Sequence, residues 1–219
     1  MNKTQLASIM DHTLLKAVAT PQQIEEFCHT AIALNTASVC VNPCYVVLAA
    51  KLLKDSPVKV CTVIGFPLGA NTTAVKVFET KDAIANGAQE VDMVINLGAL
   101  KSENWDLVEA DIRSVVEAAN GVLTKVIIEC CYLTEEEKKL ACAACSRAGA
   151  DYVKTSTGFG TGGATVADVT LMKAAIPENM KVKAAGGMHS WKEAEAMVEA
   201  GASRLGTSAT LAILEGAEK

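Results

Sequence analysis

Residues 151–163 read DYVKTSTGFGTGG, a short apolar segment that runs into a lysine and then into a loop with four glycines. The first residues have the length and composition of a β-strand, and the glycines mark the turn that ends it. KVKAAGG (181–187) has the same form, with a lysine close to a glycine pair. Glycine lets backbone N–H groups approach a bound anion. Both segments therefore predict strands that end at ligand-binding loops.

These segments belong to a series of apolar runs that alternate with amphipathic stretches. The pattern predicts eight strands, over residues 7–11, 37–41, 58–64, 90–96, 124–130, 151–155, 181–185 and 203–207. It predicts helices over residues 21–34, 73–88, 104–121, 134–150, 165–176, 190–202 and 208–219. Thr20-Pro21 is a typical helix start, and Thr134 with Glu137 forms a capping-box motif. Strands that alternate with helices in this way form parallel βαβ units.

Eight such units in 219 residues fit a closed (β/α)8 TIM barrel. We therefore expect residues 1–219 to form a single barrel domain, which this length allows. An open doubly wound sheet is the rival fold. That fold more often carries a glycine fingerprint after its first strand, where this chain has MDHTLLK (10–16).

Composition excludes several function classes. The formal net charge is -5, so there is no basic footprint for nucleic acid. The start of the chain lacks the pattern of a signal peptide, and apolar runs fall short of the roughly 18 residues of a membrane helix. We expect a soluble cytoplasmic protein without a nucleic-acid or membrane partner.

The eight cysteines are expected to be reduced thiols, because the chain is neither small nor evidently secreted. Cys142 and Cys145 have the spacing of a metal-binding pair, but a zinc site needs a second Cys/His pair at suitable spacing. No such pair is evident, so the two thiols are expected to pack a helix.

Polar residues recur at alternate positions of the strands. Strand side chains alternate between faces, so one choice of face turns Asp92, Lys125, Lys154 and Lys183 into the barrel together. The opposite choice points valines inward and these charges at the helices, which is less favourable. Parity alone does not fix the choice.

Charges in a barrel interior require partners or a function. Lys181 is expected to reach solvent at the start of its strand, and for Lys125 the same reading stays open. Lys154 and Lys183 lie later in their strands, toward the C-terminal face where barrel enzymes have their active sites.

Two neighbouring lysines suit Schiff-base chemistry. A nucleophilic lysine must be neutral, and a nearby cation or burial favours the neutral amine. Lys154 or Lys183 could then attack a carbonyl while the other stays cationic, with Asp92 as a proton relay. This combination predicts a class I aldolase.

The glycine-bearing loops predict a phosphate site. Thr157-Gly158, Gly186-Gly187 and Gly206-Thr207-Ser208 follow the sixth, seventh and eighth predicted strands. Barrel enzymes often bind phosphate with the last loops and a short helix N-terminus.

Five segments, VDMVINLGALK, KVIIE, DYVKTSTGFGTGGAT, VKAAGG and GASRLGTSA, closely resemble the deoxyribose-phosphate aldolase family. The resemblance implies a TIM-barrel lyase without metal or cofactor that cleaves 2-deoxy-D-ribose 5-phosphate reversibly to D-glyceraldehyde 3-phosphate and acetaldehyde. It implies Lys154 as the Schiff-base lysine, Lys183 as its activating neighbour and Asp92 as the proton-handling carboxylate. By the same resemblance, the substrate and its phosphate are held by Thr157, Gly158, Gly186, Gly187 and Ser208, with Asp11, Thr13, Cys40 and Lys125 also lining the pocket.

Two positions depart from the family pattern. Met188-His189 stands where many members have an apolar residue and arginine, so phosphate affinity is expected to fall as pH rises. The final LEGAEK (214–219) lacks the tyrosine that some members use in proton transfer, which leaves that task to Asp92, Lys183 and water.

Two other functions stay open at this point. One is a related Schiff-base aldolase for another phosphosugar, and the other is a phosphosugar-binding barrel without catalysis. Two lysines at strand ends argue against simple binding, since one would suffice for a phosphate. The sequence leaves a homodimer and a homotetramer open.

Overall fold

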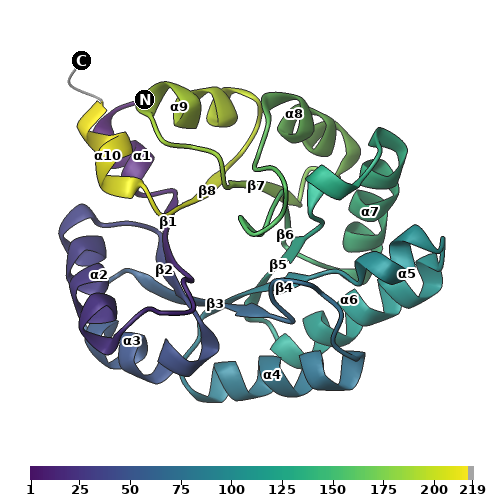
Figure 1. Ribbon diagram of the computed structural model, residues 1–219, viewed down its shortest axis with the longest axis horizontal. Helices are drawn as coiled ribbons and strands as arrows, with labels where there is room; N and C mark the ends of the chain where they lie inside the picture. Colours follow the sequence, from purple (N-terminus) through teal and green to yellow (C-terminus); the bar gives the residue numbers. More distant parts are fainter. Residues whose placement is uncertain (217–219) are drawn as a thin grey trace.

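The computed structural model describes residues 1–216, and its eight parallel strands close into one barrel (Figure 1). Neighbours in the barrel follow the order of the sequence, and β1 pairs with β8. The strands are β1 (Met10–Leu14), β2 (Ser38–Val41), β3 (Lys59–Ile64), β4 (Glu90–Val94), β5 (Leu123–Ile127), β6 (Tyr152–Lys154), β7 (Lys181–Ala185) and β8 (Arg204–Thr207). The closed (β/α)8 barrel is confirmed, and the open sheet is excluded because the ring leaves no edge strand.

Helices surround the barrel on its outside (Figure 1). They are α1 (Lys3–Ala7), α2 (Pro21–Leu34), α3 (Val46–Leu53), α4 (Thr73–Ala85), α5 (Leu97–Lys101), α6 (Trp105–Ala119), α7 (Glu135–Ala148), α8 (Val166–Ala175), α9 (Trp191–Glu199) and α10 (Thr210–Glu215). Short 3-10 turns, η1 (Pro43–Tyr45) and η2 (Cys130–Tyr132), follow β2 and β5. Within residues 1–216, no helix is both long enough and apolar enough to span a bilayer.

The first predicted strand, over residues 7–11, starts three residues too early and shares only Met10 and Asp11 with β1. Residues Lys3–Ala7 form a helix, which begins with a capping box between Asn2 and Gln5, and β1 starts only at Met10. The predicted run ended at Asp11, yet the strand continues through the polar residues His12 and Thr13 to Leu14. The reason is that Asp11 points into a charged barrel interior, where a polar side chain finds partners.

Two further helices, α3 and α5, were missed in the sequence in addition to α1. In α3, Val46, Ala49 and Leu53 are buried at helical spacing, but Val47 is apolar and 61% exposed, which obscures the period. The five residues of α5 form a single turn capped by the Asn96 side chain, which accepts from the backbone N–H of Ala99. The sequence pattern had assigned Asn96 to the end of a strand.

The apolar core consists of a large cluster and a small one. Val91, Val153 and Val182 are fully buried in the large apolar core that also contains the buried faces of the helices. The smaller apolar cluster contains Leu15, Cys40, Cys61 and Val63, with Phe66 packed against it. The next inward-facing positions on the strands hold charged groups, and these make the candidate site.

Candidate active site

A buried carboxylate, Asp92, joins the three predicted interior lysines. Its Oδ1 accepts from Nζ of Lys125 at 2.8 Å. Its Oδ2 accepts from Nζ of Lys154 at 2.7 Å and from Nζ of Lys183 at 2.7 Å. None of the four side chains is more than 3% exposed. The inward orientation of all four residues is therefore confirmed, and the solvent-facing alternative for Lys125 is wrong.

The strand register explains this convergence. Asp92 on β4 lies opposite Lys125 on β5, and Lys154 on β6 lies opposite Lys183 on β7. Two residues before Lys183, Lys181 is exposed at the start of its strand, as expected. Because side chains alternate between the two faces of a strand, four adjacent strands, β4 to β7, each place a charged side chain inside the barrel.

A second layer of charge lies toward the other end of the barrel. Lys183 also forms an ion pair with Asp11, and Lys125 forms one with Glu90 at 2.6 Å. Arg204 bridges the two carboxylates, with Nη1 2.6 Å from Asp11 and 3.1 Å from Glu90. Glu90 and Arg204 were not predicted. Glu90 could have been found by parity, since it lies two residues before Asp92 on the same strand face.

The cluster has a surplus of positive charge. It contains four cationic side chains, Lys125, Lys154, Lys183 and Arg204, but three carboxylates, Asp11, Glu90 and Asp92. Release of one proton from a lysine would make the cluster formally neutral. A buried group of charges favours that state, because an unpaired charge is expensive to keep away from water.

The pKa shifts indicate which groups stay charged. Burial alone would raise the pKa of Asp92, but Lys125, Lys154 and Lys183 outweigh it and hold that pKa well below its usual range. Burial likewise would lower the pKa of Lys183, but Asp11 and Asp92 outweigh it and raise that pKa. Lys183 is therefore held as a cation and Asp92 as an anion.

A cavity of about 480 Å³ opens above this cluster. Among the predicted site residues, its lining contains Thr13, Lys154, Thr157, Gly158, Gly186, Gly187 and Ser208. The remaining predicted residues, Asp11, Cys40, Asp92, Lys125 and Lys183, are fully buried and do not line it. Of the three lysines bonded to Asp92, Lys154 is thus the one that faces the cavity. Lys16 and His189 add two further basic side chains to the lining.

Glycines give the cavity its space. Gly186 and Gly187 both have φ of +76°, a left-handed conformation that glycine adopts without strain. A Cβ on Gly206 would lie 2.9 Å from Cε of Lys183, so a glycine here leaves room for the lysine. A Cβ on Gly163 would lie 2.5 Å from the backbone carbon of Gly186. The loops after β6 and β7 therefore pack backbone against backbone.

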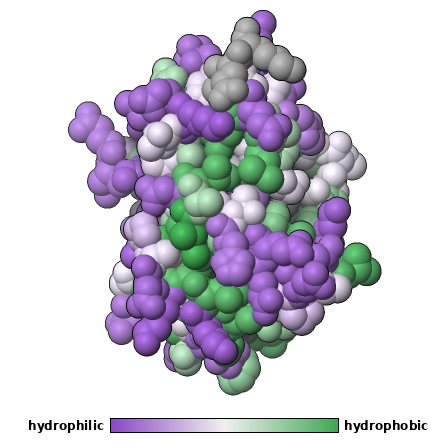
Figure 2. Space-filling view, turned by 90° about the vertical axis from the view of Figure 1, so that its left-hand side faces the viewer, coloured by the Kyte–Doolittle hydropathy of each residue, from purple (hydrophilic) through white to green (hydrophobic). Residues whose placement is uncertain are grey.

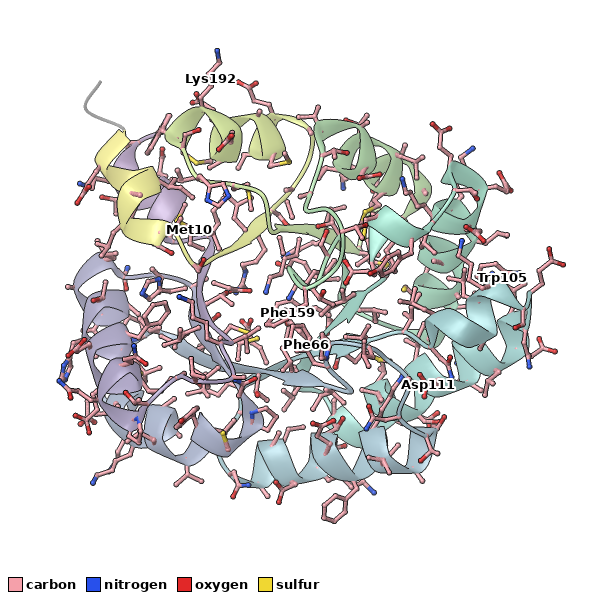
Figure 3. All side chains as sticks on the ribbon, in the orientation of Figure 1. Met10, Phe66, Trp105, Asp111, Phe159 and Lys192 are labelled. Carbon is pink, nitrogen blue, oxygen red and sulfur yellow. The ribbon has the colours of Figure 1, made fainter. Side chains whose placement is uncertain are left out.

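Two aromatic rings lie at the barrel mouth. Phe66 and Phe159 meet edge to face, with ring centroids 5.3 Å apart, near the centre of the view down the barrel (Figure 3). Phe159 lines the cavity and is 56% exposed. This pair places an apolar wall beside the polar loop that contains Thr157.

The histidines differ in their surroundings. His12 is buried and stacks on Phe27 at 3.5 Å, and burial lowers its pKa to about 4. Its Nδ1 is 2.9 Å from Oγ1 of Thr210, so its stacking and its hydrogen bond indicate a packing role. His189 lines the cavity, and its backbone N–H donates to Glu193 in the capping box of α9.

The thiols and carboxylates of the interior form two groups with the spacing of metal ligands, Cys40 with Cys61 and Asp92, and Asp11 with Cys61 and Glu90. An ammonium group already occupies this region, since Nζ of Lys125 lies 2.8 Å from Asp92, 2.6 Å from Glu90 and 3.5 Å from Cys61. Glu90 and Asp92 of these groups therefore already form ion pairs with a lysine.

Cys142 and Cys145 are buried in α7, and burial raises the pKa of Cys142 to about 12 and that of Cys145 well above its usual value. Both are the helix-packing thiols that were expected.

Comparisons with known proteins agree with this geometry. A family model described as DeoC/LacD family aldolase matches residues 6–216. A deoxyribose-phosphate aldolase of Clostridium perfringens is 60% identical over 99% of this chain and 97% of its own length. One from Lysinibacillus sphaericus is 62% identical over 96% of this chain and 95% of its own length. The tetrameric deoxyribose phosphate aldolase of Aeropyrum pernix has a TM-score of 0.93 at 34% identity, covering 100% of this chain and 93% of that one.

Proposed function

The chain belongs to the DeoC/LacD family of aldolases, and on that premise we propose that it cleaves 2-deoxy-D-ribose 5-phosphate reversibly through a Schiff base on Lys154. The products are D-glyceraldehyde 3-phosphate and acetaldehyde, so the enzyme is a carbon–carbon lyase. One observation carries the assignment of the nucleophile. Lys154 and Lys183 share Oδ2 of Asp92, yet Lys154 is the one that lines the cavity.

The charge balance supports Lys154 as the amine that loses its proton. Lys183 contacts both Asp11 and Asp92, and these carboxylates raise its pKa. Lys154 has one carboxylate partner, Asp92, and shares it with two other cations. Deprotonation of Lys154 removes the surplus charge from the cluster and produces a nucleophile at the cavity floor.

The reaction then follows from the iminium group. Lys154 Nζ adds to the C1 aldehyde of the open-chain sugar, and loss of water gives the iminium ion. The C3 hydroxyl gives up its proton, the C2–C3 bond breaks, and its electron pair moves into the iminium to form an enamine. Protonation of the enamine at C2 and hydrolysis of the resulting imine release acetaldehyde.

Asp92 and Lys183 handle the protons of these steps in this proposal. Asp92 is an anion that already bonds to the attacking amine, and it passes protons between substrate and cluster through water. Lys183, on the same carboxylate oxygen, is the adjacent acid. Residues 214–219, LEGAEK, contain no tyrosine that could share this task, and residues 217–219 lie outside the described residues.

The phosphate of the substrate is bound at the far end of the cavity in this proposal. Gly186, Gly187 and Ser208 line the cavity, and the left-handed glycines leave their backbone accessible. Lys16 adds a positive charge to the lining, and His189 adds an imidazole. The role of the exposed Lys16 comes from its place in the lining alone, since sequence patterns did not single it out.

Several broader properties are part of the same proposal. Residues 1–219 act as one catalytic domain, because the barrel closes between β1 and β8 and the family match spans it. A reducing cytoplasm suits eight free cysteines. A homodimer or homotetramer is supported by the tetrameric relative and by a band of apolar residues on the face shown in Figure 2. Helices on that side of the barrel expose Ile32, Val47 and Leu211.

Borohydride trapping tests the proposed function. The protein is incubated with acetaldehyde and reduced, and the modified residue is located by peptide mass spectrometry. We expect an ethyl adduct on Lys154 that is absent in Lys154→Leu, while Lys181→Leu, which removes an exposed lysine of the same barrel, retains it.

An adduct on Lys183 instead would reverse the two lysine roles. No adduct above the background of surface lysines would refute the aldolase and leave a binding barrel. Acetaldehyde as the donor, with D-glyceraldehyde 3-phosphate as the acceptor, separates this activity from an aldolase for another phosphosugar.

A further inference from the structure

A buried glutamate, Glu129, lies beside the substrate loop and has no part in the mechanism above. It follows β5, has φ of +53°, and is 2% exposed. Backbone hydrogen bonds on each side fix its position, from Ile128 N–H to the Lys154 carbonyl at 3.0 Å and from Cys130 N–H to the Thr155 carbonyl at 2.8 Å. Glu129 is thus attached to the end of the strand that carries the proposed nucleophile.

The carboxylate of Glu129 takes up both hydrogen-bond donors of Thr157. The backbone N–H of Thr157 is 3.2 Å from Oε1 and 3.3 Å from Oε2. The hydroxyl of Thr157 donates to Oε2 in a short hydrogen bond. A carboxylate offers acceptors only, so the direction of both contacts is fixed. Thr157 therefore has no donor left for a ligand.

The hydroxyl of Thr157 can still accept one hydrogen bond. A threonine hydroxyl has one donor and two acceptor sites. Phe159 N–H donates to Oγ1 of Thr157 at 3.0 Å and uses one of those sites. One acceptor site is left, on a side chain that lines the cavity. Thr157 can accept a hydrogen bond from a substrate hydroxyl, but it cannot donate one to a phosphate.

From this arrangement we propose that Glu129 is a positioning residue that fixes Thr157 as an acceptor for the C4 hydroxyl of the substrate. This rests on the proposed function. The C3 hydroxyl must give its proton toward Asp92 for the bond to break. The C4 hydroxyl, between the cleaved bond and the phosphate ester, is the remaining hydroxyl donor as the sugar passes along the wall that contains Thr157.

The surroundings of Glu129 keep its carboxylate in place. A Cβ on Gly160 would lie 3.1 Å from the carboxyl carbon of Glu129 and 2.9 Å from Sγ of Cys131. The glycine loop therefore closes directly over Glu129. This explains a glycine at position 160, which the phosphate-binding role of the loop does not require.

The test compares two phosphorylated acceptors with acetaldehyde as the donor. One is D-glyceraldehyde 3-phosphate, whose C2 hydroxyl becomes the C4 hydroxyl of the sugar. The other is the same aldehyde phosphate without that hydroxyl. The readout is the ratio of their kcat/KM values. We expect Glu129→Gln and Thr157→Val each to lower this preference about ten-fold, the order of one lost hydrogen bond.

Three further variants separate positioning from general damage. Thr157→Ser keeps the hydroxyl and is expected to keep the preference. In the Thr157→Val background, Glu129→Gln is expected to change the ratio no further, because Glu129 acts through that hydroxyl. Glu79→Gln is the matched control, since Glu79 also accepts a backbone N–H, from Gly65 at 2.7 Å, on another loop. It is expected to leave the ratio unchanged.

Trapping of the acetaldehyde adduct on Lys154 is measured on every variant, since acetaldehyde has no hydroxyl for Thr157. A normal adduct with an unchanged ratio in Glu129→Gln and Thr157→Val would overturn this inference alone. A full effect of Glu129→Gln in the Thr157→Val background would also overturn it. If Glu129→Gln fails to fold, an unchanged ratio in Thr157→Val suffices to refute it. A wild-type protein without the adduct would refute the proposed function, and this inference with it.

Discussion

Replacement of Lys183 by methionine tests the charge argument for the nucleophile. Nζ of Lys154 and Nζ of Lys183 both lie 2.7 Å from Oδ2 of Asp92, so they are at most about 5.4 Å apart. At an effective dielectric constant of about 20, two unit charges at that distance repel by about 3 kcal/mol. Loss of Lys183 removes that repulsion, and the protonated form of Lys154 becomes more favourable by the same amount.

The expected result is a loss of imine formation near pH 7 by about two hundred-fold, which is the factor that corresponds to about 3 kcal/mol. The rate of imine formation is expected to recover as pH rises. At higher pH the Lys154 ammonium loses its proton even without repulsion from Lys183. Trapping of the acetaldehyde adduct on Lys154 with cyanoborohydride, from pH 6 to pH 10, measures both effects.

Two controls accompany this variant. Lys181→Met removes an exposed lysine from the same strand and is expected to leave the profile unchanged. Thermal unfolding shows whether Lys183→Met is folded, since it leaves Asp11 and Asp92 with one fewer cation. A folded Lys183→Met protein that traps acetaldehyde at the wild-type rate at pH 7, or whose rate does not rise with pH, would refute the reasoning.

Three further results are expected. Gly206→Ala places a Cβ 2.9 Å from Cε of Lys183, so we expect about 1–3 kcal/mol lower stability in denaturant unfolding and a lower kcat; unchanged values of both would show that the lysine moves aside freely. His189→Arg is expected to lower the KM for the phosphorylated substrate and weaken its pH dependence between pH 5.5 and 8, with kcat little changed, and an equal KM at both pH values in the wild type would contradict a phosphate role for His189. Asp11 and Asp92 have pKa values held below their unfolded values, so the stability they contribute is present above about pH 4 and is lost as pH falls through their folded pKa values; the melting temperature, measured from pH 6 down to pH 2, is expected to fall more steeply in the wild type than in a folded Asp11→Asn variant.

The cluster of Asp92 with its three lysines could be predicted from the sequence, because side chains on a strand alternate between faces every two residues. Parity placed Asp92, Lys125, Lys154 and Lys183 on one face, and the argument against pointing valines inward selected the correct face. The second layer of charge, which contains Glu90 and Arg204, was missed for a physical reason. Glu90 and Arg204 stand at the first positions of their strands, where charged residues commonly reach solvent, and only the register across the closed barrel brings them together.

The contact between Glu129 and Thr157 could not be predicted from the sequence, for a different reason. The two residues are 28 positions apart, and Glu129 approaches the loop because its backbone takes a left-handed conformation. That conformation is uncommon for a residue other than glycine, asparagine or aspartate. A strand pattern continued through position 129 would have pointed its side chain according to strand parity. Tertiary contacts, including the hydrogen bonds to Lys154 and Thr155, decide it instead.

The barrel mouth is open on one side and closed by apolar side chains on the other, and this supports the proposed position of the nucleophile. The cavity lining comes from β1 and the segment after it, from the ends of β6, β7 and β8, and from the loops that follow those three strands. The lining positions on β7 and β8 are small, as Ala185, Gly186 and Gly206 show. The opposite side, over β2 and β3, is closed by the apolar cluster of Leu15, Cys40, Cys61 and Val63 with Phe66.

In the proposed function, an aldehyde that enters the barrel therefore meets the β6–β8 side. The reactive amine must stand where this open side meets the charged layer below. On β7, Lys183 lies beneath Ala185 and Gly206 and is closed off by its carboxylates. On β5, Lys125 is fully buried among Glu90 and Asp92. Lys154 ends the shortest of the eight strands, at the edge of the cavity, where it bonds to Asp92 and also lines the cavity. The small residues on β7 and β8 thus support the proposal that the lysine of β6 is the nucleophile, as much as the charges do.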